Sequence, residues 1–157
     1  MGILGLLAYV VATGLGPLYK EKPDRVTYPA VAIAEQAGQR WAEYSGERPF
    51  SYVVGSEWLG GMICAYHPER PTVMIRGDQV RATYMSDQDV QKYGALVIWQ
   101  KSRDASDGRN VKMQSYYPDL IERFPNVEIK KDLLVDWPRR TDKLQARFGI
   151  AYIPAQK

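Results

Sequence analysis

The sequence has one cysteine, Cys64, and one histidine, His67. A single cysteine excludes a framework of disulfide bonds within the chain and a cysteine-rich metal site. A single histidine excludes sites built from several histidines, and any Ser-His-Asp triad would have to use His67. We therefore expect no metal site and no cofactor. Cys64 stands among apolar residues and is interpreted as a small buried side chain. His67 is interpreted as an ordinary surface or capping residue.

An excess of charge of one sign is also lacking. The formal net charge is +3 over 157 residues, and the basic residues are scattered along the chain. This excludes the usual electrostatic argument for nucleic-acid binding. Hydrophobic residues make up 45% of the chain, with four tryptophans and eleven tyrosines, so a core of normal size can form. The length suits about one domain.

Charged side chains are missing from the first 18 residues, MGILGLLAYVVATGLGPL. This stretch lies near the lower limit of the ~17–25 residues that cross a bilayer. A membrane helix, whole or partial, suits the glycine content and the abrupt change to YKEKPDR. A signal peptide and a buried first helix stay open, although the positive start of the former is lacking and the glycines weaken the latter. We interpret residues 1–18 as a membrane-helix remnant or anchor and residues 19–157 as a soluble α/β domain.

A helix is predicted over AVAIAEQAGQRWAEY, with Pro29 as its first residue and Gly46 as its end. Its spacing places one apolar face on Val31, Ala34, Ala37, Trp41 and Tyr44.

Three later segments, FSYVVG, PTVMIRG and ALVIWQ, are continuously apolar, as in parallel strands that are covered on both faces. Short helices are predicted between them over EWLGGMICAY and SDQDVQKY, and a third over YPDLIERF after a polar surface loop. VEIKKDLLVDW and ARFGIAYIP predict two closing strands, and the short link between them favours an antiparallel pair. The expected fold is α/β: a three-layer sandwich whose mixed sheet has central parallel strands and a C-terminal antiparallel pair, preceded by an N-terminal apolar helix.

The stretch YVVGSEWLGGM ends a predicted strand and begins a helix, and it supplies three of four candidate ligand-binding residues: Ser56, Glu57, Trp58 and Asp78. Ser56 either presents its hydroxyl to an anion or, as we favour, caps the helix. Trp58 either stacks on a sugar or, as we favour, packs in the core. Asp78 follows the second strand, so it could face Glu57 across the strand ends and form a carboxylate pair for acid/base or metal chemistry. The stretch matches neither G-x-S-x-G, nor a P-loop, nor G-x-G-x-x-G.

The order of RVTYPAVAIAEQAGQRW, YVVGSEWLGGMICAYHPERPTVMIRGD, YGALVIWQ and FGIAYIPAQ resembles one module. It is similar to the C-terminal extracytoplasmic domain of bacterial membrane glycosyltransferases of the dolichyl-phosphate-mannose–protein mannosyltransferase superfamily, which includes the aminoarabinose transferases that act on lipid A. The resemblance covers the chain from about Arg25 onward and rests on segment order, not on a catalytic signature.

The resemblance implies an accessory domain without catalytic residues of its own, in a truncated, standalone or split form of an enzyme that uses a polyprenyl-phosphate sugar. The implied location is the bacterial inner membrane, with the soluble domain facing the periplasm or cell exterior. The implied partners are the membrane, the membrane portion of the enzyme and a glycan or lipid-linked acceptor, and nucleic acid is not among them. Lys20, Lys22 and Arg25 favour a cytoplasmic location instead. The alternative function is an independent small α/β hydrolase or transferase that uses Glu57 and Asp78.

Overall fold

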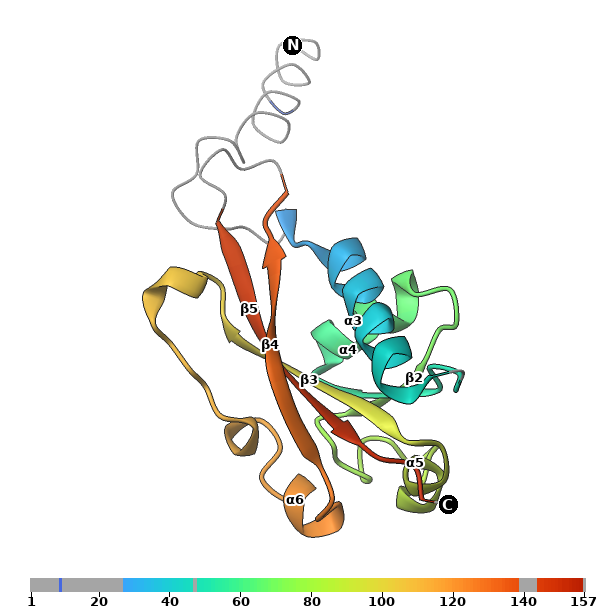
Figure 1. Cartoon of the computed structure of the whole chain (residues 1–157). Helices are drawn as coiled ribbons and strands as arrows, with labels where there is room; N and C mark the ends of the chain where they lie inside the picture. Colours follow the sequence, from blue (N-terminus) through green and yellow to red (C-terminus); the bar gives the residue numbers. More distant parts are fainter. Residues whose placement is uncertain (1–8, 10–26, 47, 139–143, 157) are drawn as a thin grey trace.

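The structure is a computed structural model that describes residue 9 and residues 27–46, 48–138 and 144–156 (Figure 1). Residues 1–18, where the sequence predicts a membrane segment, lie outside the described residues apart from Tyr9. Within the described ranges, none of the helices has the length and apolar character that crossing a bilayer requires.

The described residues form a mixed α/β fold around a five-stranded sheet with the strand order β2-β1-β3-β5-β4. The helices and strands, in chain order, are α3 (Ala30–Ser45), β1 (Tyr52–Gly55), α4 (Glu57–Tyr66), β2 (Thr72–Ile75), α5 (Asp87–Tyr93), β3 (Ala95–Ser102), η2 (Ala105–Asp107), η3 (Met113–Ser115), α6 (Leu120–Arg123), β4 (Glu128–Asp136) and β5 (Gln145–Ile153). This confirms the predicted combination of parallel and antiparallel strands.

The parallel part of the sheet consists of β2, β1 and β3, and the antiparallel part of β3, β5 and β4. The antiparallel pairing of β4 with β5 is the predicted one. One prediction is wrong: the sequence predicts a central position for the strand in PTVMIRG, but β2 lies at an edge of the sheet. Its four residues were not enough to distinguish a short edge strand from a central one, because both are apolar.

Alternate residues of the sheet enter two separate hydrophobic cores. Leu96 and Ile98 of β3 pack with α3 and α4, whereas Val97 and Trp99 pack with α5, η3 and α6 on the opposite face. This division follows from the pleat of a strand, in which successive side chains point to opposite faces. Both faces of the central strands are therefore covered, as the continuous apolar runs predicted.

Helix α3 buries Ala34, Ala37 and Trp41, as its spacing predicts. Trp41 is 2% exposed, and its indole N–H lies within hydrogen-bonding distance of the carbonyl oxygens of Arg48 and Pro49. The predicted face is wrong at its first position, because Val31 is 51% exposed and Ile33 is buried in its place. Pro29 is the N-cap and not the first helical residue.

Glycine permits the close approach of α4 to the parallel strands. A side chain at Gly60 would meet Cγ1 of Val73 at 2.5 Å, and one at Gly55 would meet the backbone of Gly60 at 3.0 Å. The two glycines thus bring the helix N-terminus down onto the end of β1. The GSEWLGG segment is a tight strand-to-helix connection for this steric reason.

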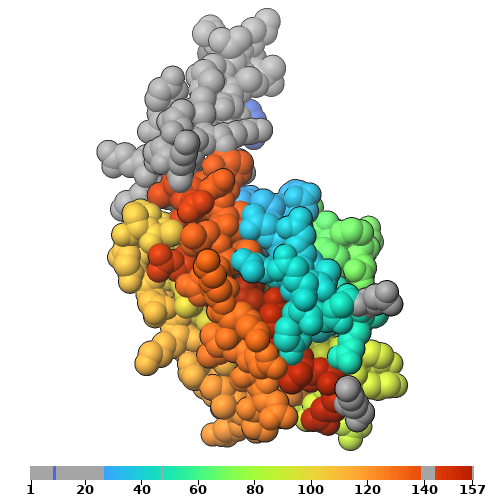
Figure 2. Space-filling model, viewed as in Figure 1, coloured from blue at the N-terminus to red at the C-terminus, as the bar shows by residue number. Residues whose placement is uncertain are grey.

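The outer strand β4 differs from the central strands. Its residues alternate between buried and exposed near its C-terminal end, and its first four residues are exposed. Figure 2 shows β4 crossing this face of the molecule between α3 and the segment that follows β3.

Candidate functional site

The connections around β1 create a point where ligands often bind in open α/β sheets. The chain leaves β1 through α4 to reach β2 on one side, and then passes through α5 to reach β3 on the other. Because α4 and α5 pack on opposite faces, a crevice opens between the carboxyl ends of β1 and β3. Ser56 follows β1 at this crevice, and Gln100 lies near the end of β3.

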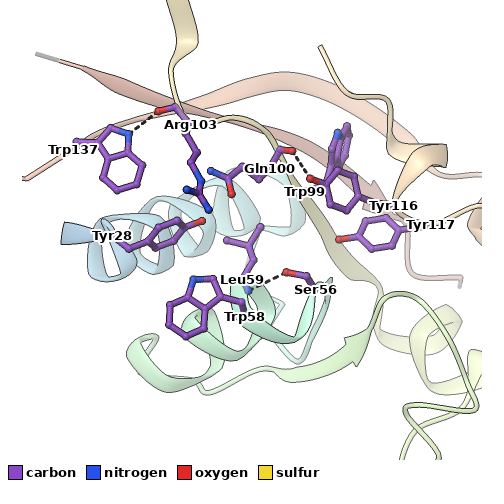
Figure 3. Close-up of a pocket in the computed structure, with 10 residues that line it drawn as sticks. All are labelled: Tyr28, Ser56, Trp58, Leu59, Trp99, Gln100, Arg103, Tyr116, Tyr117 and Trp137. Carbon is purple, nitrogen blue, oxygen red and sulfur yellow. Dashed lines mark hydrogen bonds between the residues drawn. The ribbon is translucent and has the colours of Figure 1, made fainter. Parts of the chain in front are cut away.

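A cavity of about 280 Å³, which we call the aromatic pocket, occupies this crevice. Six aromatic side chains make up most of its lining, together with one leucine and three polar residues (Figure 3). The lining residues are Tyr28, Ser56, Trp58, Leu59, Trp99, Gln100, Arg103, Tyr116, Tyr117 and Trp137. None of them carries a carboxylate.

Edge-to-face contacts hold one wall of the pocket. The ring of Tyr28 lies 6.3 Å from that of Trp58 at 70° and 5.5 Å from that of Trp137 at 86°. Trp58 is 53% exposed and stands at the mouth. Its large apolar ring is therefore available to a ligand.

The floor of the pocket is set by a glycine on the neighbouring strand. Trp99 is paired with Gly149 across β3 and β5, and a Cβ at Gly149 would lie 2.1 Å from two atoms of the indole ring. The missing side chain lets the indole lie against the β5 backbone. The Trp99 N–H also donates to the carbonyl of Val111 at 2.8 Å, which fixes the ring.

The side chains of Gln100 and Arg103 meet in the pocket. Figure 3 shows the Gln100 amide and the Arg103 guanidinium directed toward the same space. Gln100 Nε2 is buried and lacks a hydrogen-bond partner within the described part of the chain. None of the ion pairs between described residues involves Arg103. A buried donor without a partner is costly, so this arrangement favours an acceptor from outside.

The backbone of Arg103 is held from both sides. Its carbonyl accepts a hydrogen bond from the Trp137 indole N–H at 2.8 Å. The preceding Ser102 is buried, and its hydroxyl oxygen lies 2.7 Å from the Asp104 carbonyl and 2.6 Å from Asp107 Oδ2. Contact with Ser102 holds the pKa of Asp107 below its usual value. The guanidinium therefore extends from a well-anchored turn.

Burial keeps the hydroxyls of Tyr28 and Tyr117 protonated. It raises the pKa of Tyr28 well above the usual 10.0, although the nearby Arg103 partly opposes this effect. Burial likewise raises the pKa of Tyr117, whose hydroxyl donates to the Ile98 carbonyl at 2.6 Å. At neutral pH the phenol of Tyr28 is thus a further neutral donor and not a phenolate.

A second group of side chains lies on the β2 side of the same edge, and we call it the arginine–carboxylate cluster: Glu57, Arg76, Asp78 and Arg81. Glu57 Oε1 lies 3.1 Å from Arg76 and 3.3 Å from Arg81, and Arg81 lies 3.6 Å from Asp78. The N–H of Glu57 itself, followed by the side chain of Arg76, lowers the pKa of the Glu57 carboxyl. Glu57 therefore stays ionised at neutral pH and is a poor general acid.

The structure divides the four candidate residues between these two groups. Ser56 and Trp58 line the aromatic pocket, whereas Asp78 lines a separate cavity of about 300 Å³. Glu57 and Asp78 do come together, but Arg81 bridges them. No three His, Cys, Asp or Glu side chains in the described ranges are grouped so that they could hold a metal ion.

The favoured interpretation of Ser56 agrees with the structure, and that of Trp58 does not. Ser56 caps α4 by accepting a hydrogen bond from the Leu59 N–H at 3.1 Å. Trp58 is half-exposed, so the predicted core position is wrong: Leu59 and Ile63 form the buried face of α4. Cys64 is only partly buried, contrary to expectation. His67 ends α4, and its ring lies against Gly38 and Phe50.

Sequence reasoning missed most of the aromatic pocket. Gln100 was placed in a strand and Arg103 in a surface loop, and no function was given to Tyr28, Tyr116 or Trp137. The available signal was aromatic residues inside otherwise polar segments, namely YY before Pro118 and W before Pro138. That signal does not say which of them meet.

Comparison with family models, curated proteins and solved structures gives no match to this chain.

Proposed function

We propose that this chain is a non-catalytic accessory domain of a polyprenyl-phosphate-sugar-dependent membrane glycosyltransferase. The proposal includes attachment to the bacterial inner membrane through residues 1–18, with the soluble part facing the periplasm or cell exterior. It also includes the finer description of the fold, a three-layer α/β sandwich preceded by an apolar helix. The resemblance in segment order supports the family, and the strand-end geometry supports the accessory role.

One observation carries the accessory role: arginines hold both strand-end carboxylates. Glu57 contacts Arg76 and Arg81, and Arg81 also contacts Asp78. A carboxylate pair that works as acid and base needs one member with a raised pKa, whereas the pKa of Glu57 is lowered. Beside them lies an open pocket whose lining is suited to binding. This arrangement also disfavours the alternative, a hydrolase or transferase that uses Glu57 and Asp78.

A transfer assay tests the proposal. The full chain is reconstituted in liposomes with a polyprenyl-phosphate-linked sugar and a lipid acceptor, alone or with the membrane portion of such an enzyme lacking its own soluble domain. We expect no transfer by the chain alone and restored transfer with the membrane portion. Turnover by the chain alone that is lost in Glu57→Gln would refute the accessory role and favour the alternative.

Membrane attachment is tested separately by fractionation. The full chain is compared with a chain that begins at Lys20. We expect the full chain in the membrane fraction and the shorter chain in the supernatant, because the uncharged stretch up to Leu18 is removed. Equal solubility of the two chains would refute attachment through this segment.

A further inference from the structure

The aromatic pocket has the features of a binding site for a charged ligand with a ring. It lies at the crevice between the carboxyl ends of β1 and β3, where the strand order reverses. Three independent features define its chemistry: unsatisfied donors, the absence of a carboxylate among its lining residues, and an exposed aromatic ring at its mouth.

The donors favour an anion. The Arg103 guanidinium carries a permanent positive charge and up to five N–H groups, and the Gln100 amide adds two more. Gln100 Nε2 is buried without a hydrogen-bond partner in the described ranges, and none of the ion pairs between described residues includes Arg103. A phosphate or carboxylate oxygen placed between the two groups would satisfy both, through charge-assisted hydrogen bonds.

The rest of the lining fits a sugar ring. The half-exposed indole of Trp58 offers an apolar face, while the hydroxyls of Ser56 and Tyr28 offer polar contacts at the ring edge. A volume of about 280 Å³ lies just below the ~300–1,000 Å³ typical of small-molecule pockets. This volume suits a ligand, or a part of a ligand, of about the size of a monosaccharide.

We infer that the aromatic pocket binds a small anionic carbohydrate, a monosaccharide that carries a phosphate or a carboxylate. Arg103 and Gln100 bind the anion, and Trp58 packs against the sugar ring. This inference deepens the proposed function and rests on it for the biological origin of the sugar, a phosphorylated or acidic unit of the acceptor. The binding itself depends only on the pocket.

The test is calorimetric titration of the full chain at low salt, in a detergent without a sugar headgroup. The probes are glucose 1-phosphate, glucuronate, glucose and inorganic phosphate. We expect glucose 1-phosphate or glucuronate to bind at least about tenfold more tightly than glucose, because a hydrogen bond to a charged group is worth ~1.5–3 kcal/mol. The charged sugar should also bind more tightly than inorganic phosphate, which lacks the ring. A preference between the two charged sugars identifies the anion.

Matched variants locate the binding. Arg103→Gln and Trp58→Ala should each weaken it about tenfold or more. Arg109→Gln, on the same loop, and Tyr66→Ala, an exposed aromatic on the same helix, should leave it unchanged. Gln100→Glu supplies an internal carboxylate to Arg103, so it should abolish anion binding while near-ultraviolet circular dichroism stays native.

Three results would overturn the inference: no binding of either charged sugar at 10 mM (about the weakest affinity of interest), equal binding of glucose, or unchanged binding in Arg103→Gln and Trp58→Ala. Because no membrane portion is present, these results are independent of the transfer assay. Binding without restored transfer refutes the glycosyltransferase role alone, and restored transfer without binding refutes the ligand alone.

Discussion

The aromatic pocket and the arginine–carboxylate cluster lie at the same edge of the sheet, yet they use arginine in opposite ways. In the cluster, Arg76 and Arg81 each contact a carboxylate of their own chain. In the pocket, Arg103 stands beside another donor, Gln100, and no described carboxylate pairs with it. Both groups of residues lie at strand ends. Their position therefore does not explain why one group stabilises the chain and the other can bind a ligand.

The difference lies in how each group is satisfied. In the arginine–carboxylate cluster, the opposite charges pair with one another and restrain the connections after β1 and β2. Few unpaired charges remain there to contact a ligand. Donors that converge without an acceptor leave a desolvation cost that a ligand can remove. The sequence pattern points to the carboxylates, whereas the structure places an unsatisfied donor, Gln100 Nε2, on β3, and Arg103, which is in none of the described ion pairs, on the turn that follows.

The largest expected loss of stability is in the core, away from both regions. It serves as the reference for the smaller losses expected in the pocket and the cluster. Trp41→Ala removes a buried ring that stacks on Phe50 at 5.7 Å. We expect a loss of roughly 3–5 kcal/mol in the free energy of unfolding, as for other large core truncations. Urea denaturation followed by circular dichroism measures it. A loss below about 1 kcal/mol would contradict the packing of α3.

The next effect should separate the two regions. Gly149→Ala places a methyl group 2.1 Å from the Trp99 ring in the described geometry, so the floor of the aromatic pocket must shift. We expect a loss of about 1–3 kcal/mol and weaker binding of the charged sugar. Gly61→Ala is the control, because nothing lies within 4 Å of its Cβ position, and there we expect a gain of up to ~1 kcal/mol. Unchanged stability in Gly149→Ala would show that Trp99 is free to move aside.

Neutralising the cluster should have a smaller effect. Glu57→Gln with Asp78→Asn removes exposed ion pairs, each typically worth ~0–1 kcal/mol, and should leave sugar binding in the pocket within about twofold. In a reconstituted enzyme these changes should weaken acceptor use or stability modestly. Complete loss of transfer with an intact fold would make the two carboxylates catalytic candidates again.

The pH dependence of this cluster has a defined sign. The pKa of Glu57 is lowered in the folded state, so its stabilising contribution is present above its ordinary value of 4.5 and is lost as the pH falls through the folded value. We expect a slightly shallower acid unfolding curve in Glu57→Gln than in the parent. An identical curve would mean that neither the N–H of Glu57 nor the arginines stabilise the carboxylate.

The last effect concerns two tyrosines of the pocket, Tyr28 and Tyr117. The folded-state pKa values of Tyr28 and Tyr117 are raised by burial, so stability is complete below about pH 10.0 and falls as the pH rises toward the folded values. Tyr117→Phe removes the bond to Ile98 and should cost about 0.5–1.5 kcal/mol at pH 7 while making the alkaline loss shallower. Stability measured from pH 7 to 11 checks both. A steeper alkaline loss in the variant would contradict burial of this hydroxyl.

Features that depend on a few neighbouring residues were predictable from the sequence. The capping box of Ser86 and Asp89 forms at the start of α5, and Ser56 caps α4. Both result from hydrogen bonds between residues three apart, which the sequence contains. The mixed sheet was also predictable, since the apolar runs and the short link before β5 limit the arrangements that a chain can adopt.

Features that depend on how distant elements meet were not predictable. The exposure of Trp58 depends on which face of α4 packs on the sheet, and Gly60 decides this by contacting Val73. The meeting of Gln100, Arg103 and Trp137 depends on β3 and β4 lying on either side of β5. Local periodicity holds no information on that order, so Gln100 and Arg103 were not predicted as pocket residues, although the edge of the sheet that bears them was identified.

The pairing of β3 with β5 also has a consequence for folding kinetics. Its register joins Ala95 to Ile153 and Trp99 to Gly149, so the long segment between the two strands must close as a loop before the pair can form. Closure of such a loop costs entropy before it brings stabilising contacts, which slows this step relative to the docking of α4 on β1 and β2. We therefore expect Trp99 and Arg103 to reach their positions late, so that the aromatic pocket is among the last parts of the molecule to become ordered.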